Sequence, residues 1–205
     1  MLPKLYHDIE SKPPVVLLHG LAGAARFWEP QFEALLKAGL RPIALDLLGH
    51  GDRKPVHSLT LEAFVQDVDD AIRKMELDRP ILVGHSMGAM IAEILMARSP
   101  SQYRGAVLCS YLPFDTPDSE SRASFLEDKL APLAAGAAMS DLAEANFDES
   151  AGPEGAECPF RSLGVSMFAT TPSSTYQAAL QCFCSFEEAE ARLENIELPV
   201  LCIAG

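Results

Sequence analysis

The sequence predicts an α/β fold in which a mostly parallel sheet carries helices on both faces. Two observations lead to this prediction. Short apolar runs without polar alternation recur along the chain, each shortly after a Pro or a Gly, and longer segments with helical periodicity lie between them. Unalternating runs are typical of parallel strands buried on both faces, and strand–helix alternation is typical of α/β proteins. The length of 205 residues suits one domain with a modest insertion.

Five of these runs are the predicted strands. Leucine and β-branched residues dominate each of them, so both faces of each strand are apolar. The fifth run lies far along the chain from the fourth, after a long segment that lacks the strand pattern. The runs are Val15–Leu18, Pro42–Leu45, Ile81–Val83, Ala106–Cys109 and Val200–Ile203.

Three helices are predicted between the first four strands. The first candidate is Phe27–Lys37, which ends before Gly39. The second begins after Thr60, a residue type that caps helix N-termini, and its apolar residues repeat at helical spacing up to Met75. The third, Gly88–Arg98, is apolar almost all round, so we expect a buried helix.

The pattern between the fourth and fifth strands differs from the rest. From residue 112 to residue 195 the sequence contains Ala-rich, Glu-rich and Pro-interrupted segments, which predict two to four short helices and no buried strand. An insertion between two sheet strands is a natural lid over a site. We therefore expect a core over residues 1–111, a helical lid over 112–195, and a core strand resuming over 196–205.

Composition excludes several classes of partner. Lys and Arg total 16 against 29 Asp and Glu, a net charge of −13 that argues against nucleic acid and anionic membranes. No segment has the apolar composition of a membrane span, and the N-terminus lacks the apolar core of a signal peptide. The five cysteines form no C-x-x-C pair and no zinc-like cluster with histidine. We expect reduced thiols, a cytoplasmic location and no metal.

The strongest chemical motif is G-x-S-x-G at Gly84–Gly88, between a predicted strand and a predicted buried helix. This strand–turn–helix setting is that of a nucleophile elbow, in which the turn holds the Ser86 hydroxyl out of the sheet. The amide of Met87 then lies at a helix N-terminus, where it can bind a developing oxyanion. The motif is neither G-x-G-x-x-G nor a P-loop, and no cofactor is expected.

Two further motifs follow the first two strands. His19-Gly-Leu-Ala-Gly23 places the amide of Leu21 as a second oxyanion donor, with His19 as an anchor of the loop rather than a proton acceptor. Asp46-Leu-Leu-Gly-His50, followed by a glycine, is interpreted as a structural turn. Neither Asp46 nor His50 is expected to act directly in catalysis.

These three motifs in this order resemble the α/β-hydrolase superfamily of serine hydrolases. The resemblance runs from Val15 to Gly205, and the segment from Met167 to Leu198 is similar to the closing part of the lid in esterase- and lactonase-type members, 3-oxoadipate enol-lactonase among them. It implies the α/β-hydrolase fold and acyl transfer through Ser86. One departure is Arg53, where many relatives have Ser after the G-H-G turn.

The resemblance also implies a catalytic acid and histidine after the nucleophile. All five histidines, His7, His19, His50, His57 and His85, are at or before position 85, so none is the late triad histidine. We therefore expect a C-terminally truncated hydrolase that lacks the last strand and helix. Loss of those elements predicts an exposed strand edge at Val200–Ile203 and a partner or self-association there.

Asp115 has two interpretations. Some relatives place the catalytic acid after the strand that corresponds to Ala106–Cys109, which would make Asp115 the acid. The alternative is that Asp115 and Asp118 cap the first lid helix, with Pro117 at its start, and this pattern favours the cap.

The function expected from the resemblance is hydrolysis of a small carboxylic ester, thioester or lactone through an acyl-enzyme on Ser86. Leu21 and Met87 hold the oxyanion in this reaction. A cofactor-free lyase or C–C bond hydrolase uses the same framework and remains an alternative. A second alternative is a non-catalytic binding module, since the late Asp and His of the triad are absent.

Overall fold

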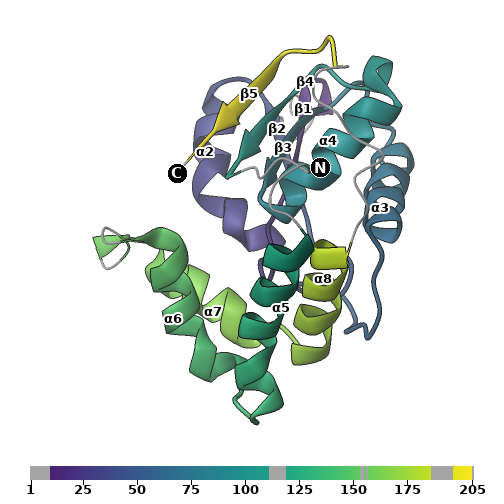
Figure 1. The fold of residues 1–205 in the computed structure, drawn as a ribbon. Coiled ribbons are helices and arrows are strands. Elements are labelled where there is room, and N and C mark those ends of the chain that lie inside the picture. Colours follow the sequence, from purple (N-terminus) through teal and green to yellow (C-terminus); the bar gives the residue numbers. More distant parts are fainter. Residues whose placement is uncertain (1–9, 111–118, 153–154, 156, 186–195, 205) are drawn as a thin grey trace.

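The computed structural model describes residues 10–110, 119–152, 155, 157–185 and 196–204 (Figure 1). Its centre is a five-stranded sheet in the order β2-β1-β3-β4-β5, and all four strand pairs are parallel. This confirms the predicted α/β class and all five predicted strands. The strands are β1 (Pro14–Leu18), β2 (Arg41–Leu45), β3 (Ile81–His85), β4 (Gly105–Cys109) and β5 (Val200–Ile203).

Helices cover both faces of the sheet, as predicted (Figure 1). On one face, the 3-10 turn η1 (Ala25–Trp28) and helix α2 (Glu29–Lys37) pack against alternate residues of β1, and Trp28 is buried among them. On the other face lie α3 (Leu61–Lys74) and α4 (Met87–Arg98), the latter followed by the short turn η2 (Pro100–Gln102). The alternation of side chains along β1 sends successive residues to opposite helical layers.

Helices α3 and α4 follow directly from their sequences. Thr60 accepts a hydrogen bond from the amide of Ala63 at 3.1 Å, which confirms the predicted N-cap of α3. The apolar stripe of α3 is buried, whereas α4 is buried on nearly every side over Met87–Met96. An all-apolar helix must be enclosed, and α4 lies between β3, β4 and α3.

Within the described part of the insertion, four helices lie between β4 and β5, at the upper end of the predicted range. They form two packed pairs, α5 with α8 and α6 with α7 (Figure 1). Both pairs lie beyond one end of the sheet, on the side where β3 leads into α4 (Figure 1). The helices are α5 (Ser119–Ala134), α6 (Met139–Ala151), α7 (Arg161–Thr170) and α8 (Ser173–Ser185).

Strand burial departs from the prediction at the sheet edges. Strand β1 is buried at every position, but all five residues of β2 are half-buried. Strand β5 leaves Leu201 57% and Ile203 47% exposed. The expectation that every strand is buried on both faces is therefore wrong for these two strands, because an edge strand has a neighbour on one side only.

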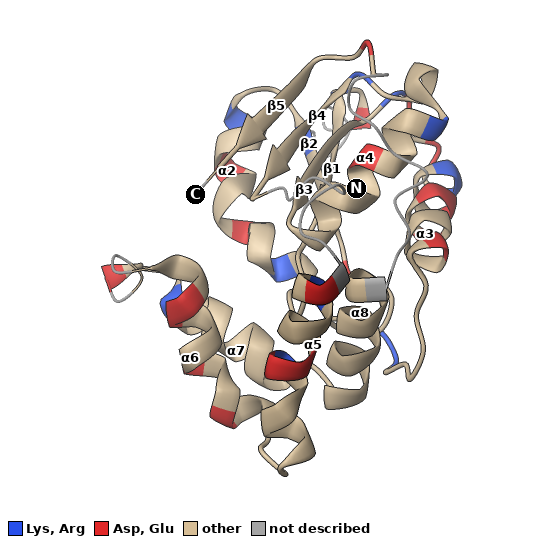
Figure 2. Ribbon diagram, viewed as in Figure 1, with Lys and Arg blue, Asp and Glu red and all other residues tan. Residues whose placement is uncertain are grey.

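The charged residues are unevenly distributed over the inserted helices (Figure 2). Asp and Glu are concentrated on α5 and α6, whereas α8 contains no charged residue. Among the described residues, no helix is long and apolar enough to cross a membrane.

Candidate active site

The turn between β3 and α4 holds Ser86 in an unusual backbone conformation. Its φ is +49° and its ψ is −114°, outside the regions that non-glycine residues ordinarily occupy. The amide of Ser86 donates to the carbonyl of Cys109 on β4 at 2.9 Å, and the carbonyl of Ser86 accepts from the amide of Ala89 at 2.8 Å. The turn is thus fixed on both sides, which holds the strained residue in place.

The two glycines of the motif permit this close approach of strand and helix. A Cβ on Gly84 would collide with the backbone of Gly88 and Ala89, and a Cβ on Gly88 would collide with the carbonyl of Leu18 in β1. Any larger residue at either position would force α4 away from the sheet. Glycine is therefore required at both positions for steric reasons.

The loop that follows β1, residues 19–23, is fixed from within by His19. The Nε2 atom of His19 accepts a hydrogen bond from the amide of Leu47 at 3.0 Å, so that nitrogen carries no proton. The proton of the neutral ring is therefore on Nδ1, which donates to the carbonyl of Gly20 at 2.8 Å. Burial, with a contribution from nearby His50, lowers the pKa of His19 to about 3. The prediction that His19 anchors the loop is confirmed.

Leu21 lies on this same loop, next to the anchored carbonyl. The Gly20 carbonyl accepts from His19 and also from the amide of Gly23 at 3.1 Å. That carbonyl and the amide N–H of Leu21 belong to one planar peptide group and point in opposite directions. The two hydrogen bonds on the carbonyl therefore fix the direction of the Leu21 N–H.

A cavity of about 470 Å³ contains both Ser86 and the β1 loop in its wall. The floor comes from Gly20–Gly23, Phe27, His85 and Ser86, and all four inserted helices contribute the remainder. Aromatic side chains form much of that remainder, with Lys129 and Glu149 as the charged residues. The inserted residues include Phe125, Lys129, Asn146, Phe147, Glu149, Met167, Phe168 and Tyr176.

The structure places the predicted site residues as follows. Ser86 and Leu21 share the cavity, and Met87 is the first residue of α4 with its side chain buried. Asp115 lies outside the described residues, so neither of its two interpretations is tested.

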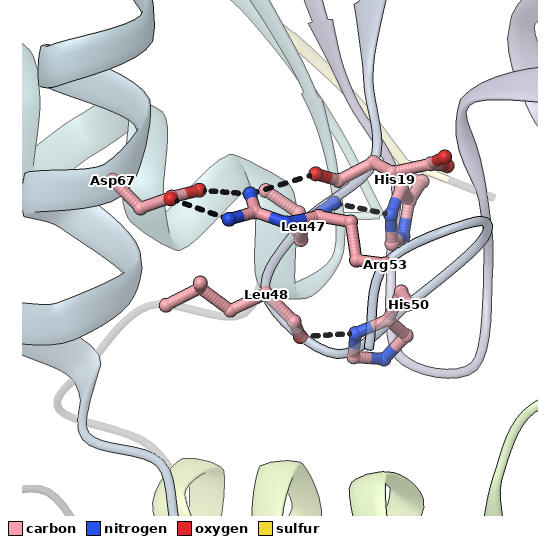
Figure 3. Close-up of polar contacts among 7 residues, drawn as sticks. His19, Leu47, Leu48, His50, Arg53 and Asp67 are labelled. Atoms are coloured by element: carbon pink, nitrogen blue, oxygen red, sulfur yellow. Dashed lines mark hydrogen bonds and ion pairs between the residues drawn. The ribbon is translucent and has the colours of Figure 1, made fainter. Parts of the chain in front are cut away.

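The loop after β2, residues 46–57, is held by polar contacts of its own (Figure 3). The Asp46 carboxylate accepts from the amides of Ala25 at 2.6 Å and Asp52 at 3.1 Å, which is the structural role predicted for this residue. Arg53 donates to both carboxylate oxygens of Asp67 on α3, at 2.5 and 2.8 Å. The arginine thus joins the β2 loop to α3.

A comparison with known protein families identifies the chain. The model of the alpha/beta hydrolase family matches residues 15–200. The chain belongs to the alpha/beta hydrolase family. This confirms the resemblance inferred from the three motifs.

Individual relatives and structures agree with this assignment. This α/β hydrolase is 34% identical over 110 residues to the non-heme chloroperoxidase CPO-A1 of Kitasatospora aureofaciens, a match covering 53% of this chain and 40% of that protein. A hydrolase from Pseudomonas aeruginosa has a TM-score of 0.81 at 23% identity, over 95% of this chain and 72% of the other. The enol-lactonase from Burkholderia xenovorans LB400 has a TM-score of 0.76 at 24% identity, over 95% and 73%. These two structures show the shared fold. The matched segment spans less than half the length of the first curated relatives.

Three described histidines of this hydrolase, His19, His50 and His85, make contacts away from the Ser86 hydroxyl. His50 is buried and donates from Nδ1 to the carbonyl of Leu48 at 2.9 Å, and burial lowers its pKa. Burial also lowers the pKa of His85, which packs against Phe27 with ring centroids 5.2 Å apart. His57 is exposed. Within the described ranges no histidine is hydrogen-bonded to the Ser86 hydroxyl, and no group of three or more potential ligands could hold a metal ion.

Several contacts of the inserted segment were not predicted, among them two hydrogen bonds to the core and one ion pair within the insertion. Thr171 and Thr175 each bond to a loop of the core, and Lys129 forms an ion pair with Glu149. The hydrogen-bonded partners are 149 and 119 residues apart in sequence, so no local pattern could have indicated them.

Proposed function

We propose that this α/β hydrolase cleaves a small, mostly apolar carboxylic ester, thioester or lactone through an acyl-enzyme on Ser86. The observation that carries the proposal is the conformation of Ser86, which the elbow holds at φ +49° in the wall of an aromatic-lined cavity. Strain at a serine between a strand and a buried helix is a feature of activated nucleophiles. Its fold-level relatives include esterases and an enol-lactonase.

In the proposed reaction, the Ser86 Oγ attacks the substrate carbonyl carbon and the carbonyl oxygen becomes negatively charged. The amides of Leu21 and Met87 donate hydrogen bonds to this oxyanion. Collapse of the intermediate expels the alcohol, thiol or ring oxygen and leaves an acyl-enzyme. Water then attacks the acyl-enzyme and releases the acid.

Ser86 needs a base to accept its proton, and the base needs an acidic partner to orient it. His19 is an unsuitable base because both of its ring nitrogens are hydrogen-bonded inside the loop. In the proposal, the base and its partner come from outside the described residues.

Helices α5–α8 act as a lid in this proposal, with residues 1–111 and 196–205 as the core. They supply most of the cavity wall, so an acyl group bound at Ser86 would be shielded from water by their aromatic side chains. Recognition is therefore expected to favour short apolar acyl chains over charged ones.

The test is hydrolysis of p-nitrophenyl butyrate, combined with labelling by an aryl fluorophosphonate and mass spectrometry. We expect the Ser86→Ala variant to lose both hydrolysis and labelling. The matched control is Ser110→Ala, because Ser110 is also a serine of positive φ at the end of a neighbouring strand. Hydrolysis retained in Ser86→Ala would contradict the proposal, and a folded chain without hydrolysis or labelling would favour a binding module.

A further inference from the structure

One buried hydroxyl of the insertion forms a hydrogen bond to the β1 loop. Thr171 lies between α7 and α8 and is 6% exposed. Its Oγ1 is 3.2 Å from the carbonyl oxygen of Ala22 and 3.0 Å from that of Met167. Both neighbours are acceptors, so the hydroxyl is the donor and its single hydrogen is shared between them.

A continuous series of hydrogen bonds leads from this hydroxyl to Leu21. The Ala22 carbonyl accepts from Thr171, and the N–H of the same peptide group, that of Gly23, donates to the carbonyl of Gly20 at 3.1 Å. The N–H of the Gly20 peptide group is that of Leu21. Two planar peptide groups therefore connect the Thr171 hydroxyl to the Leu21 amide.

This series affects both the direction and the strength of the last donor. Each accepted hydrogen bond polarises its peptide group, so that the N–H at the opposite end becomes a better donor. Ala22 also has a φ of +55°, which costs free energy for a residue with a Cβ and requires support from its surroundings. The Thr171 hydroxyl bonds to the carbonyl of that residue.

We propose that Thr171 is a positioning residue that links the inserted helices to the Leu21 amide. The proposal rests on the function proposed above, in which that amide stabilises the oxyanion. It follows that the oxyanion site is fully formed only when the junction of α7 and α8 is seated on the β1 loop.

Thr175 provides a matched control on the same segment. It is fully buried, four residues further along the chain, and its Oγ1 accepts a hydrogen bond from the amide of Val56 at 3.1 Å. Val56 lies in the β2 loop, and Thr175 has no hydrogen bond to the β1 loop among the described residues. Removing the Thr175 hydroxyl loses the bond to Val56, and removing that of Thr171 loses the bonds to Ala22 and Met167. Only the bond to Ala22 leads to Leu21.

The first measurement is amide hydrogen exchange by NMR on the 15N-labelled chain. In Thr171→Val we expect the protection of Gly23 to fall by about fivefold, the value of one neutral hydrogen bond, and the Leu21 amide proton to shift upfield. Thr171→Ser should restore both. Thr175→Val should instead lower the protection of Val56 and leave that of Gly23 unchanged. Unchanged Gly23 protection in Thr171→Val, or an equal fall in Thr175→Val, would overturn the link.

The second measurement is turnover of p-nitrophenyl butyrate by the same variants. We expect Thr171→Val to lower kcat by about fivefold while KM stays within about twofold, because the effect develops with the charge in the transition state. An unchanged kcat despite lowered Gly23 protection would overturn the positioning role. If the unsubstituted chain hydrolyses no ester, the proposed function fails, and hydrogen exchange alone still decides whether Thr171 controls the β1 loop.

Discussion

Helices α6 and α8 both line the cavity of Ser86, but they are built differently. Helix α8 contains no charged residue, and most of its residues from Thr175 to Cys182 are buried. Helix α6 carries acidic residues (Figure 2), four in all. It buries only Met139 and Ala143. The first has the pattern of a core helix, the second that of a surface helix.

Their polar contacts differ in the same way. Thr175 of α8 bonds to the β2 loop of the core. The ion pairs of α6 are with its neighbours in the insertion, Glu149 with Lys129 of α5 and Asp148 with Arg161 of α7. The difference teaches that the cavity has one side fixed to the core and one held mainly within the insertion. We therefore expect the cavity to open by displacement of α6.

The largest expected effect is on the free energy of unfolding, when one leucine of α8 and one of α6 are each replaced by alanine. Leu180 of α8 is fully buried, whereas Leu142 of α6 is half-buried. We expect Leu180→Ala to lower the free energy of unfolding by about 3 kcal/mol, since it leaves a cavity in a packed region. Leu142→Ala should cost about 1 kcal/mol or less. Urea denaturation measures both, and equal losses would mean that α6 is as firmly packed as α8.

Acid is expected to weaken the side of the cavity that is fixed to the core, because His19 anchors the β1 loop there. In the fold the pKa of His19 is lowered from 6.5 to about 3, so between these values the unfolded chain binds more protons than the folded one. The stability present above pH 6.5 is therefore lost progressively as the pH falls. The lowered pKa of buried His50 adds to this loss, and α6 has no histidine.

The measurement is urea denaturation between pH 6 and pH 5, above the range in which ordinary carboxylates titrate. We expect His19→Gln to reduce the slope of the unfolding free energy by up to about 1.4 kcal/mol per pH unit, the value for one proton. An identical slope in the two proteins would show that His19 accepts a proton without unfolding.

The smallest effect is expected at the ion pair between α5 and α6. Lys129 Nζ is 2.5 Å from Glu149 Oε2, and the glutamate side chain is 64% exposed. The lysine side chain is 20% exposed. A pair with one largely exposed partner contributes about 0.5 kcal/mol, and salt screens it. A double-mutant cycle of Lys129→Met and Glu149→Gln should give a coupling of this size that disappears at high salt. A coupling above about 2 kcal/mol would contradict the view that α6 is loosely held.

Much of the fold could be predicted because its signals are local. The unalternating runs indicated all five strands, and Thr60 indicated the start of α3 because a cap acts three residues away. The start of the helix predicted over Phe27–Lys37 was placed less accurately. Its first residues form η1, and α2 begins at Glu29, with Pro30 in its first turn. Strand burial at β2 and β5 could not be predicted, since it depends on which strands lie at the edges.

In the candidate site, too, features with local signals were predicted and features that depend on packing were not. Ser86 was found from a five-residue motif, and the anchoring of the β1 loop by His19 from the sequence around it. The partner of Arg53 could not be predicted, because the ion pair with Asp67 depends on the packing of α3 beside the β2 loop. The hydroxyl of Thr171 gave no signal for a similar reason. Its carbonyl partner is a backbone atom, which every residue has.

Among the described residues β5 is an edge strand, and we expect this edge to make the association of the chain depend on concentration and ionic strength. Leu201 and Ile203 are half-exposed on a strand whose outer edge can pair with another chain, while a net charge of −13 holds copies apart. The Debye length falls from about 10 Å at 0.1 M salt to about 3 Å at 1 M. Salt therefore removes the repulsion and leaves the strand edge unopposed. Dilute, low-salt solutions are the conditions in which this molecule is expected to remain a single copy.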